Sequence, residues 1–374
     1  MKINIAASHR FHLLDLAIEL EKLGHDVRFY SFVPRNRAVR YGLKKKCSVS
    51  LFIPMIPFLA LFKISKGSYW SIRILHCLLD WCVSILMRPC DVCIALGTVY
   101  DLSINKAKKK YGSVVILEWG SKHIEEQQRI LNEIPEVKKQ PKYFTDRTVR
   151  TYESADYIAI PSEHVERSFV ERKIPVKKIF RNPYGVNISM FHPTKLDQKD
   201  TYDIITVGSW SYQKGSDILV EVCKEKKYRL MHVGSLVDVD FPSDNNFTHV
   251  DRVDQTLLVG YYAKAKIFVL PSRQDGLAMV QLQAIICGLP LVCSEHTGGR
   301  DLRSMLFDSR WIIEMREYNK AELDICIKCA LDLANTQTGV RCYVNASSNL
   351  LSWDAYGKRY HDFILGLKTT EFGI

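Results

Sequence analysis

The sequence lacks a run of about 18 uninterrupted apolar residues, the length that a helix needs to cross a membrane. The apolar stretch 51–62, LFIPMIPFLALF, comes closest, but it is short and contains Pro54 and Pro57. The first residues, MKINIAAS, predict a short strand, whereas a signal peptide has a charged region followed by a long apolar core. We therefore expect a cytoplasmic chain that does not span a membrane.

Cysteine is present, but its pattern predicts neither disulfides nor a metal site. The 11 cysteines are odd in number and scattered, and most lie in apolar runs such as AIICGLPLVC, as reduced thiols that pack like small apolar side chains do. The Cys-x-x-Cys pairs Cys90/Cys93 and Cys326/Cys329 are far apart in the sequence, and a zinc site would need them to meet. We expect buried packing for both pairs.

Acidic residues are absent from Val33 to Leu79, in a chain whose formal net charge is +11. Such an excess of positive charge attracts nucleic acid, an anionic membrane surface or phosphorylated small molecules. Nucleic acid is disfavoured, because the basic residues do not alternate with aromatic ones and no nucleic-acid-binding module is visible. The basic residues of this segment are Arg35, Arg37, Arg40, Lys44, Lys45, Lys46, Lys63, Lys66 and Arg73.

The segment 33–79 permits two interpretations. Its basic residues surround the apolar stretch 51–62, and this combination suits an anionic bilayer surface, where each nearby charge adds about 1 kcal/mol. The alternative is a buried strand and helix beside a solvated basic loop. Both interpretations stay open at this point.

Strand-like and helix-like segments alternate along the whole chain. The first strand, INIAA, is followed by a helix with Leu13, Leu16 and Leu20 on one face, then Gly24 and the extended DVRFYSF. Further short apolar runs end in Gly or Ser, which predicts parallel sheets covered by helices on both faces. These runs are 90–97, 113–120 and 155–162 in the first half, and 202–209, 228–235, 265–272 and 289–294 in the second.

The segment 184–200 is polar and has no clear periodicity, so we place a linker there. The α/β prediction is two Rossmann-like domains, 1–190 and 191–351, whose parallel sheets face a central cleft where ligands bind. A last helix in 352–374 carries Trp353, Tyr356 and Tyr360 at helical spacing and must dock on a large surface.

Two loops at strand ends in the second half carry the clearest chemistry. In VGSWSYQKGSDILVEV, Lys214 and Gly215 lie between a strand and a helix, where an ammonium and exposed helix amides suit a diphosphate. Asp275 and Gly276 follow the third strand of this domain; the carboxylate can accept hydrogen bonds from sugar hydroxyls, and glycine permits close approach of the backbone. Gln283, in the helix that follows, could face a ribose, although either polar residue could also serve the helix alone.

In combination, these segments resemble glycosyltransferase family 4, whose retaining enzymes have the two-domain GT-B fold. PSRQDGLAMVQLQAIICGLPLVC is similar to the family's P-S-x-x-E-G-[FL]-x-x-x-x-x-E-A-x-x-x-G-x-P-V signature. NPYGVNISMFHP is similar to its interdomain segment, VGSWSYQKG to its donor loop, and SWDAYGKRY to its closing helix, which crosses back to the first domain. The resemblance covers nearly the whole chain.

The resemblance implies a donor site for a nucleoside diphosphate sugar, linked to UDP or GDP. Lys214 would neutralise the diphosphate, and Asp275 would hold the transferred sugar with backbone amides of Gly276, Leu277 and Ala278. Gln283 would face the ribose, while Arg252 and Val253 would border the base. The chain departs from the family at three of these positions: Asp275 and Gln283 replace two glutamates, Ser209 stands where an arginine often assists the lysine, and Asp251 replaces a glycine.

The resemblance places the acceptor in the first domain. A histidine on a loop there often contacts the transferred sugar, and we expect His123 in that role, with Lys214 and Asp275 as its catalytic partners and His9 as second candidate. Glu118 lies closer in register to the family's histidine. The acceptor side would also include Arg10, Gly120 and Ser121.

The function implied is sugar transfer with retention to a glycan or lipid-linked saccharide, in cell-surface polysaccharide or lipopolysaccharide synthesis. No Asp-x-Asp site suited to a donor diphosphate is seen, so we expect no metal and no cofactor. The protein would be cytoplasmic, either free or held peripherally at the inner membrane face. Two alternatives stay open: a non-catalytic partner subunit that binds a sugar nucleotide or glycan, and a sugar-nucleotide epimerase on the same fold.

Overall fold

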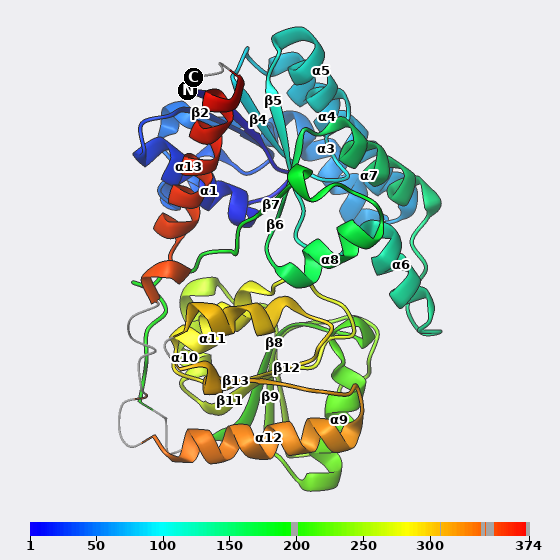
Figure 1. Ribbon diagram of the computed structural model, residues 1–374. Coiled ribbons are helices and arrows are strands. Elements are labelled where there is room, and N and C mark those ends of the chain that lie inside the picture. The colour runs from blue at the N-terminus through cyan, green and yellow to red at the C-terminus, as the bar shows by residue number, and fades with distance from the viewer. Residues whose placement is uncertain (196–200, 307, 338–340, 342–347, 372–374) are drawn as a thin grey trace.

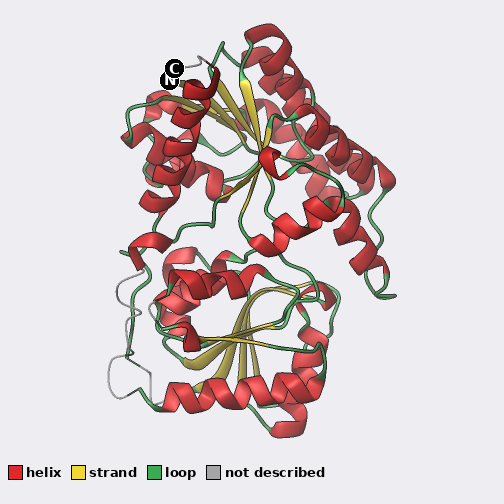
Figure 2. Ribbon diagram, in the orientation of Figure 1, coloured by secondary structure: helices red, strands yellow, loops and turns green. Residues whose placement is uncertain are grey.

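The computed structural model describes residues 1–195, 201–306, 308–337, 341 and 348–371. They form two α/β units, each built on a parallel sheet, one above the other in Figure 1. Figure 2 shows that helices cover both faces of each sheet. The predicted fold class is confirmed.

The first sheet has seven strands in the order β3-β2-β1-β4-β5-β6-β7. Ile3 and Ile5 of β1 lie between partners on β2 and β4 and are fully buried, as expected for a parallel strand covered on both faces. The strands are β1 Lys2–Ala6, β2 Asp26–Ser31, β3 Ser48–Ser50, β4 Val92–Leu96, β5 Val114–Glu118, β6 Tyr157–Ile160 and β7 Ile179–Arg181. The helices of this unit are α1 Phe11–Lys22, α2 Arg35–Arg40, α3 Phe52–Ile64, α4 Tyr69–Leu86, α5 Leu102–Tyr111, α6 Ile124–Asn132, α7 Lys142–Ser154 and α8 Glu163–Glu171, with 3-10 turns η1 Lys45–Cys47 and η2 Val176–Lys178.

The second sheet has six strands in the order β10-β9-β8-β11-β12-β13. Helices α10 and α11 pack on one face, and α9 and α12 pack on the other (Figure 1). The strands are β8 Tyr202–Trp210, β9 Leu230–Leu236, β10 Phe247–Val250, β11 Ala265–Leu270, β12 Leu291–Cys293 and β13 Ile312–Glu314. The helices are α9 Ser216–Lys226, α10 Leu258–Tyr262, α11 Met279–Ile286 and α12 Lys320–Asn335, with 3-10 turns η3 Tyr212–Lys214, η4 Gln255–Leu257, η5 Gly298–Met305, η6 Ser309–Trp311 and η7 Ser348–Leu351.

The last helix, α13 (Trp353–Glu371), returns to the first unit and lies beside α1 (Figure 1). Gly357 permits this contact, because a Cβ there would lie 2.3 Å from the Cβ of Glu19. Phe363 stacks on Phe180 of β7 with ring centroids 4.0 Å apart. The aromatic face predicted for this helix is therefore packed against the first domain, as the resemblance implied.

Helices α3 and α4 form a hairpin on the face of the first sheet opposite to α1 and α13. The hairpin contains the apolar stretch 51–62, of which the ends Leu51 and Phe62 differ sharply: Leu51 is buried and Phe62 is exposed. Within helix α3 only Met55 is buried. The structure therefore does not bury this stretch as a core strand or core helix.

Candidate functional site

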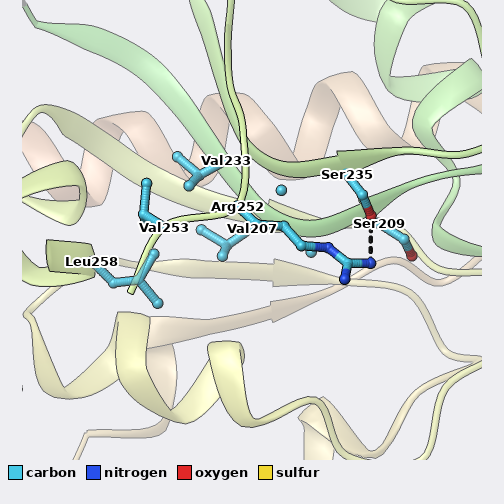
Figure 3. A pocket seen from close by; sticks show the side chains of 9 residues that line it. Val207, Ser209, Val233, Ser235, Arg252, Val253 and Leu258 are labelled. Carbon is cyan, nitrogen blue, oxygen red and sulfur yellow. Dashed lines mark hydrogen bonds between the residues drawn. The ribbon is translucent and has the colours of Figure 1, made fainter. Parts of the chain in front are cut away.

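A cavity of about 300 Å³ lies at the carboxyl ends of β8 and β9 (Figure 3). Its floor is two glycines that face each other across the strand pair: a Cβ on Gly234 would lie 1.7 Å from the carbonyl oxygen of Gly208. One wall is apolar, and at the other the guanidinium Nη2 of Arg252 donates to Ser235 Oγ at 3.1 Å. The lining residues are Val207, Gly208, Ser209, Val233, Gly234, Ser235, Arg252, Val253 and Leu258.

Three of the predicted donor-side residues, Ser209, Arg252 and Val253, thus meet at this cavity. An apolar wall combined with a cation and hydroxyls suits a flat heteroaromatic ring that carries polar edges. The carboxyl ends of parallel strands are also where ligands of open α/β sheets usually bind.

Lys214 and Asp275 lie together at the ends of β8 and β11, the neighbouring strand. Their side chains form an ion pair, and both are mostly buried. Lys214 closes turn η3, and the following Gly215 has φ +72°; a Cβ there would lie 2.0 Å from the carbonyl oxygen of Pro271. Because no larger residue fits at 215, the lysine is held close to the loop that carries Asp275.

The loop of Asp275 also forms a contact between the two domains. Asp275 Oδ1 accepts a hydrogen bond of 2.9 Å from the backbone N–H of Gly276. A Cβ on Gly276 would lie 1.9 Å from the carbonyl oxygen of Gly120, which follows β5 of the first domain. Beside this contact, Gln274 Nε2 donates to Ser121 Oγ at 2.6 Å. The predicted acceptor-side residues Gly120 and Ser121 therefore touch the donor-side loop directly.

Gln283 is buried in helix α11 and does not line the cavity. Its Oε1 accepts a hydrogen bond of 3.1 Å from the hydroxyl of Tyr262, which is itself buried. The structure therefore uses this amide to satisfy a core tyrosine, and the ribose contact expected of Gln283 stays a prediction. Leu277 is buried in the core, while Ala278 precedes the first turn of α11 and is half-buried.

His123 is placed in the core of the first domain and not in the cleft, which corrects the expected sugar contact. It is the N-cap of α6, where its Nδ1 accepts from the N–H of Glu125 at 3.4 Å. Its ring packs on Tyr152 and Phe169, and the residue is only 3% exposed. Burial lowers the pKa of His123 to about 4, so it stays neutral at physiological pH.

Glu118 is also turned away from the cleft, which corrects its expected place on the acceptor side. Its Oε1 accepts hydrogen bonds from the hydroxyls of Tyr356 at 3.0 Å and Tyr360 at 2.6 Å, both on α13. Its Oε2 lies 2.9 Å from His12 Nε2. Glu118 therefore ties the last helix to the first sheet and is buried in doing so.

The expected acceptor side does contain a cavity, of about 670 Å³, between α4, α6, α7 and the ends of β1 and β4. His9 lines it, and burial lowers the pKa of this histidine below its ordinary value. Arg10 does not line this cavity, and its guanidinium lies 3.9 Å from the ring centroid of Tyr41. Gln213, the neighbour of Lys214, contributes to the same cavity from the second domain. The loop 213–214 therefore borders both this cavity and the ion pair with Asp275.

Two features of the cleft carry no clear sequence signal. His76 of α4 faces the larger cavity, its Nδ1 is buried without a hydrogen-bond partner, and burial lowers its pKa to about 4. Gln274 bridges the domains although it stands at an unspecified position of the family signature. Only the tertiary arrangement reveals these roles.

No group of three or more potential metal ligands occurs within the described part of the chain. Asp238, of the sequence Asp238-Val239-Asp240, accepts a hydrogen bond of 2.9 Å from the N–H of Tyr212. Cys90, Cys93 and Cys326 are buried, whereas Cys329 is exposed. The expected buried packing therefore holds for three of these four cysteines.

Comparison with known sequences gives a family match for part of the chain. Residues 201–314 match the sequence model of glycosyl transferases group 1. An uncharacterized 41.2 kDa protein in the cps region of Klebsiella pneumoniae is 28% identical over 102 residues, and an uncharacterized glycosyltransferase of Methanocaldococcus jannaschii is 27% identical over 99 residues. The matched segments cover 26% and 25% of this chain, and 28% of each relative.

Comparison with solved structures extends the likeness to nearly the whole chain. Sucrose-phosphate synthase of Thermosynechococcus elongatus superposes with a TM-score of 0.65 at 14% identity, covering 99% of this chain and all of that one. HepE of Anabaena, solved with UDP and glucose, gives 0.64 at 11% identity, covering 97% and 99%. A UDP-GlcNAc 2-epimerase of Methanocaldococcus jannaschii, solved with UDP-GlcNAc and UDP, gives 0.56 at 12% identity, covering 98% and 99%. The chain thus has the GT-B fold, and its segment 201–314 matches the glycosyl transferases group 1.

Proposed function

We propose that the protein is a retaining glycosyltransferase that moves a sugar from a nucleoside diphosphate sugar to a glycan or lipid-linked saccharide. The observation that carries this proposal is the juxtaposition of Lys214 and Asp275 beside the cavity at β8 and β9. All three features lie within the segment 201–314, which matches glycosyl transferases group 1.

In this proposal the base of the donor enters the cavity between Arg252 and the apolar wall, and the diphosphate reaches Lys214 in the turn that follows β8. An arriving diphosphate replaces Asp275 as the partner of the lysine and leaves the carboxylate to accept hydrogen bonds from the sugar. UDP is the first nucleotide to test, because HepE and the epimerase were both solved with it.

The chemistry of this proposal is electrostatic. Lys214 stabilises the negative charge that develops on the leaving diphosphate, and backbone amides of Gly276, Leu277 and Ala278 support it at the start of α11. The acceptor hydroxyl approaches from the larger cavity on the same face, assisted by the leaving phosphate, and the configuration at the anomeric carbon is retained. The relative from a cps region supports an acceptor from cell-surface polysaccharide synthesis.

Mass-spectrometric turnover of a panel of UDP- and GDP-sugars tests this function, with saccharide acceptors and EDTA present. We expect release of one nucleoside diphosphate by the wild-type protein and its loss in Asp275→Ala and Lys214→Ala. Asp146→Ala, which changes an exposed acid on α7, is the matched control and should keep full turnover.

Two further measurements separate the alternatives. Saturable donor binding in a calorimetric titration, without turnover, would favour the non-catalytic partner subunit. Conversion of a UDP-sugar into its epimer in the absence of an acceptor, detected by NMR because epimers have the same mass, would favour the epimerase, whose fold the chain shares.

A further inference from the structure

The hairpin of helices α3 and α4 carries an apolar face that no other described part of the chain covers. On α4 the exposed residues recur at intervals of four and eleven, which places them on one face of the helix. On helix α3, two apolar side chains near the ends are among the most exposed: Ile53 is 79% exposed and Ile64 is 81% exposed. The stripe on α4 is Trp70, Ile74, Trp81 and Ile85.

Helix α3 is unusual in that it is apolar on all sides and yet lies at the surface. An apolar helix of this kind is ordinarily found in a core or in a membrane. Here only Met55 is buried within the helix, and the exposed side chains include Ile56, Leu61 and Phe62. Scattered single apolar residues on a surface need no explanation, but two adjacent helices that both expose several large apolar side chains do.

The charge around this face is of one sign. Lys63 and Lys66 stand at the end of α3, and Arg73 lies in the first turns of α4 with its guanidinium 5.5 Å from the ring centroid of Trp70. From residue 51 to residue 86 the single acid is Asp80, which is fully buried. The hairpin therefore presents basic and apolar groups with no exposed carboxylate of its own.

Helix α4 is long and apolar enough to cross a membrane by length and composition. The structure instead fixes it on the domain through Asp80, whose carboxylate accepts from Arg147 Nη2 at 2.8 Å and from the N–H groups of Asp101, Leu102 and Ser103 at the start of α5. These bonds hold one face of α4 against the domain. Leu75, Leu79 and Val83 are buried against the domain, and the opposite side of the helix, with both tryptophans, is the one that remains exposed.

We propose that the outer face of the α3–α4 hairpin docks into the interface of an anionic bilayer, lying in the plane of the membrane. Tryptophan favours this interfacial depth, apolar residues enter the acyl boundary, and the cations complement the acidic head groups. A second copy of the chain would not be favoured by Lys63, Lys66 and Arg73, because an isologous contact brings like charges together.

When the hairpin docks in this orientation, the position of the larger cavity indicates which class of acceptor the protein uses. Gly67, Tyr69, Ile72 and His76 of the hairpin form one wall of the 670 Å³ cavity, whose other side includes Lys138 and Lys139. The cavity therefore lies next to the docked bilayer. This consequence rests on the proposed function: the acceptor is a saccharide carried on a lipid phosphate, with its head group reaching the cavity from the membrane.

Vesicle flotation tests the docking surface without requiring any turnover. We expect the wild-type protein to float with vesicles of phosphatidylcholine and phosphatidylglycerol and to stay behind with phosphatidylcholine alone. Trp70→Ser/Trp81→Ser should lower partitioning at least tenfold, and Lys63→Gln/Lys66→Gln should lower it about fivefold per charge at low salt. Val237→Ser/Ile325→Ser, which changes exposed apolar residues of the second domain, is the matched control and should partition like the wild type.

Two further readouts keep the result interpretable. UDP binding by the tryptophan variant should equal that of the wild type, which shows that the chain is folded. The proposal is overturned if the wild type ignores anionic vesicles, or if light scattering shows a dimer that the tryptophan variant abolishes while flotation is unchanged. Vesicle binding by a protein that turns over no donor would leave the docking surface standing and remove the glycosyltransferase function and the acceptor class with it.

Discussion

Lys214 and Asp275 show how single residues keep a charged site ready for a ligand. Each is mostly buried, and each neutralises the other at the ends of β8 and β11. In the proposed function a diphosphate takes the place of Asp275 at the lysine, and the released carboxylate, no longer ion-paired, accepts hydrogen bonds from sugar hydroxyls.

His123 gives a residue-scale prediction about acid stability. Its pKa is about 4 in the folded protein, against 6.5 for an ordinary histidine, because the ring is buried. Between these pH values the unfolded chain binds more protons, so the free energy of unfolding falls as pH decreases from 6.5 to 4. His123→Asn keeps a capping side chain but does not titrate. We expect its urea midpoint to fall less between pH 7 and pH 5 than that of the wild type.

An equal fall of the urea midpoint in the wild type and in His123→Asn would show that His123 does not cause the loss of stability in acid. His76 also has a pKa of about 4 through burial and faces the larger cavity. His76→Gln is therefore the second variant of the series, and it should reduce the acid sensitivity in the same direction.

The sequence predicts some of these residues and misses others for a physical reason. Lys214 and Asp275 follow neighbouring strands of one parallel sheet, whose carboxyl ends must meet at one edge, and the structure does bring them together. Glu118 ends strand β5 and His123 follows it, but whether a polar side chain faces the cleft or the core depends on its partners. The partners of Glu118 are tyrosines of α13, far along the chain.

At the scale of elements, helix α13 connects the end of the second domain to the surface of the first. It begins next to the second domain and packs on α1 and β7 of the first. Its buried tyrosine hydroxyls converge on one carboxyl group, Glu118. Because both hydroxyls donate to the same carboxylate, we expect their two hydrogen bonds to hold α13 on the first domain cooperatively.

Tyr360→Phe tests that attachment. The substitution removes a 2.6 Å hydrogen bond to Glu118 and should lower the free energy of unfolding by about 1–3 kcal/mol in urea titrations. Combined with Glu118→Gln, the losses should be less than additive, because both variants break the same bond. Tyr157→Phe, whose ring packs on Phe363 of the same helix, is the control and should cost clearly less. Full additivity would contradict a shared bond.

The interior strands of the two sheets are predictable from the sequence, and the edge strands are not. Every apolar run that ends in Gly or Ser corresponds to a strand, from β4 and β5 to β11 and β12. The edge strands β3, β7, β10 and β13 have polar or charged side chains among their three or four residues, so they lack the continuous apolar run of the equally short β6 and β12. The α3–α4 hairpin is a further case: the sequence left two interpretations of the segment 33–79 open, and only the fold shows which of its apolar side chains stay exposed.

At the scale of the whole molecule, the two sheets are held together by close backbone contact. Gly276 lies against the carbonyl group of Gly120, and the bond from Gln274 to Ser121 crosses the same interface. Gln213 of the second domain also lines the larger cavity near His9, which otherwise belongs to the first domain. The proposed function uses this arrangement, with the donor bound by the second domain and the acceptor by the first.

Gly276→Ala tests the need for this contact. The new methyl group would overlap the carbonyl oxygen of Gly120 and hold the domains apart, so we expect donor turnover to fall at least roughly tenfold, equivalent to about 1.4 kcal/mol in the barrier. Gly260→Ala in α10 makes the same chemical change where nothing lies within 4 Å, and it should leave turnover intact. Equal turnover in the two variants would contradict a role for the contact.

The most direct test of the central claim is calorimetric titration of UDP and GDP into the wild type, Lys214→Ala and Arg252→Ala. Our account predicts saturable binding of one nucleotide by the wild type. It predicts at least tenfold weaker binding by Lys214→Ala, which loses the diphosphate partner, and a smaller loss for Arg252→Ala at the base cavity. Absence of binding to both nucleotides, or equal affinity in all three proteins, would contradict the assignment of this cleft to a nucleotide sugar.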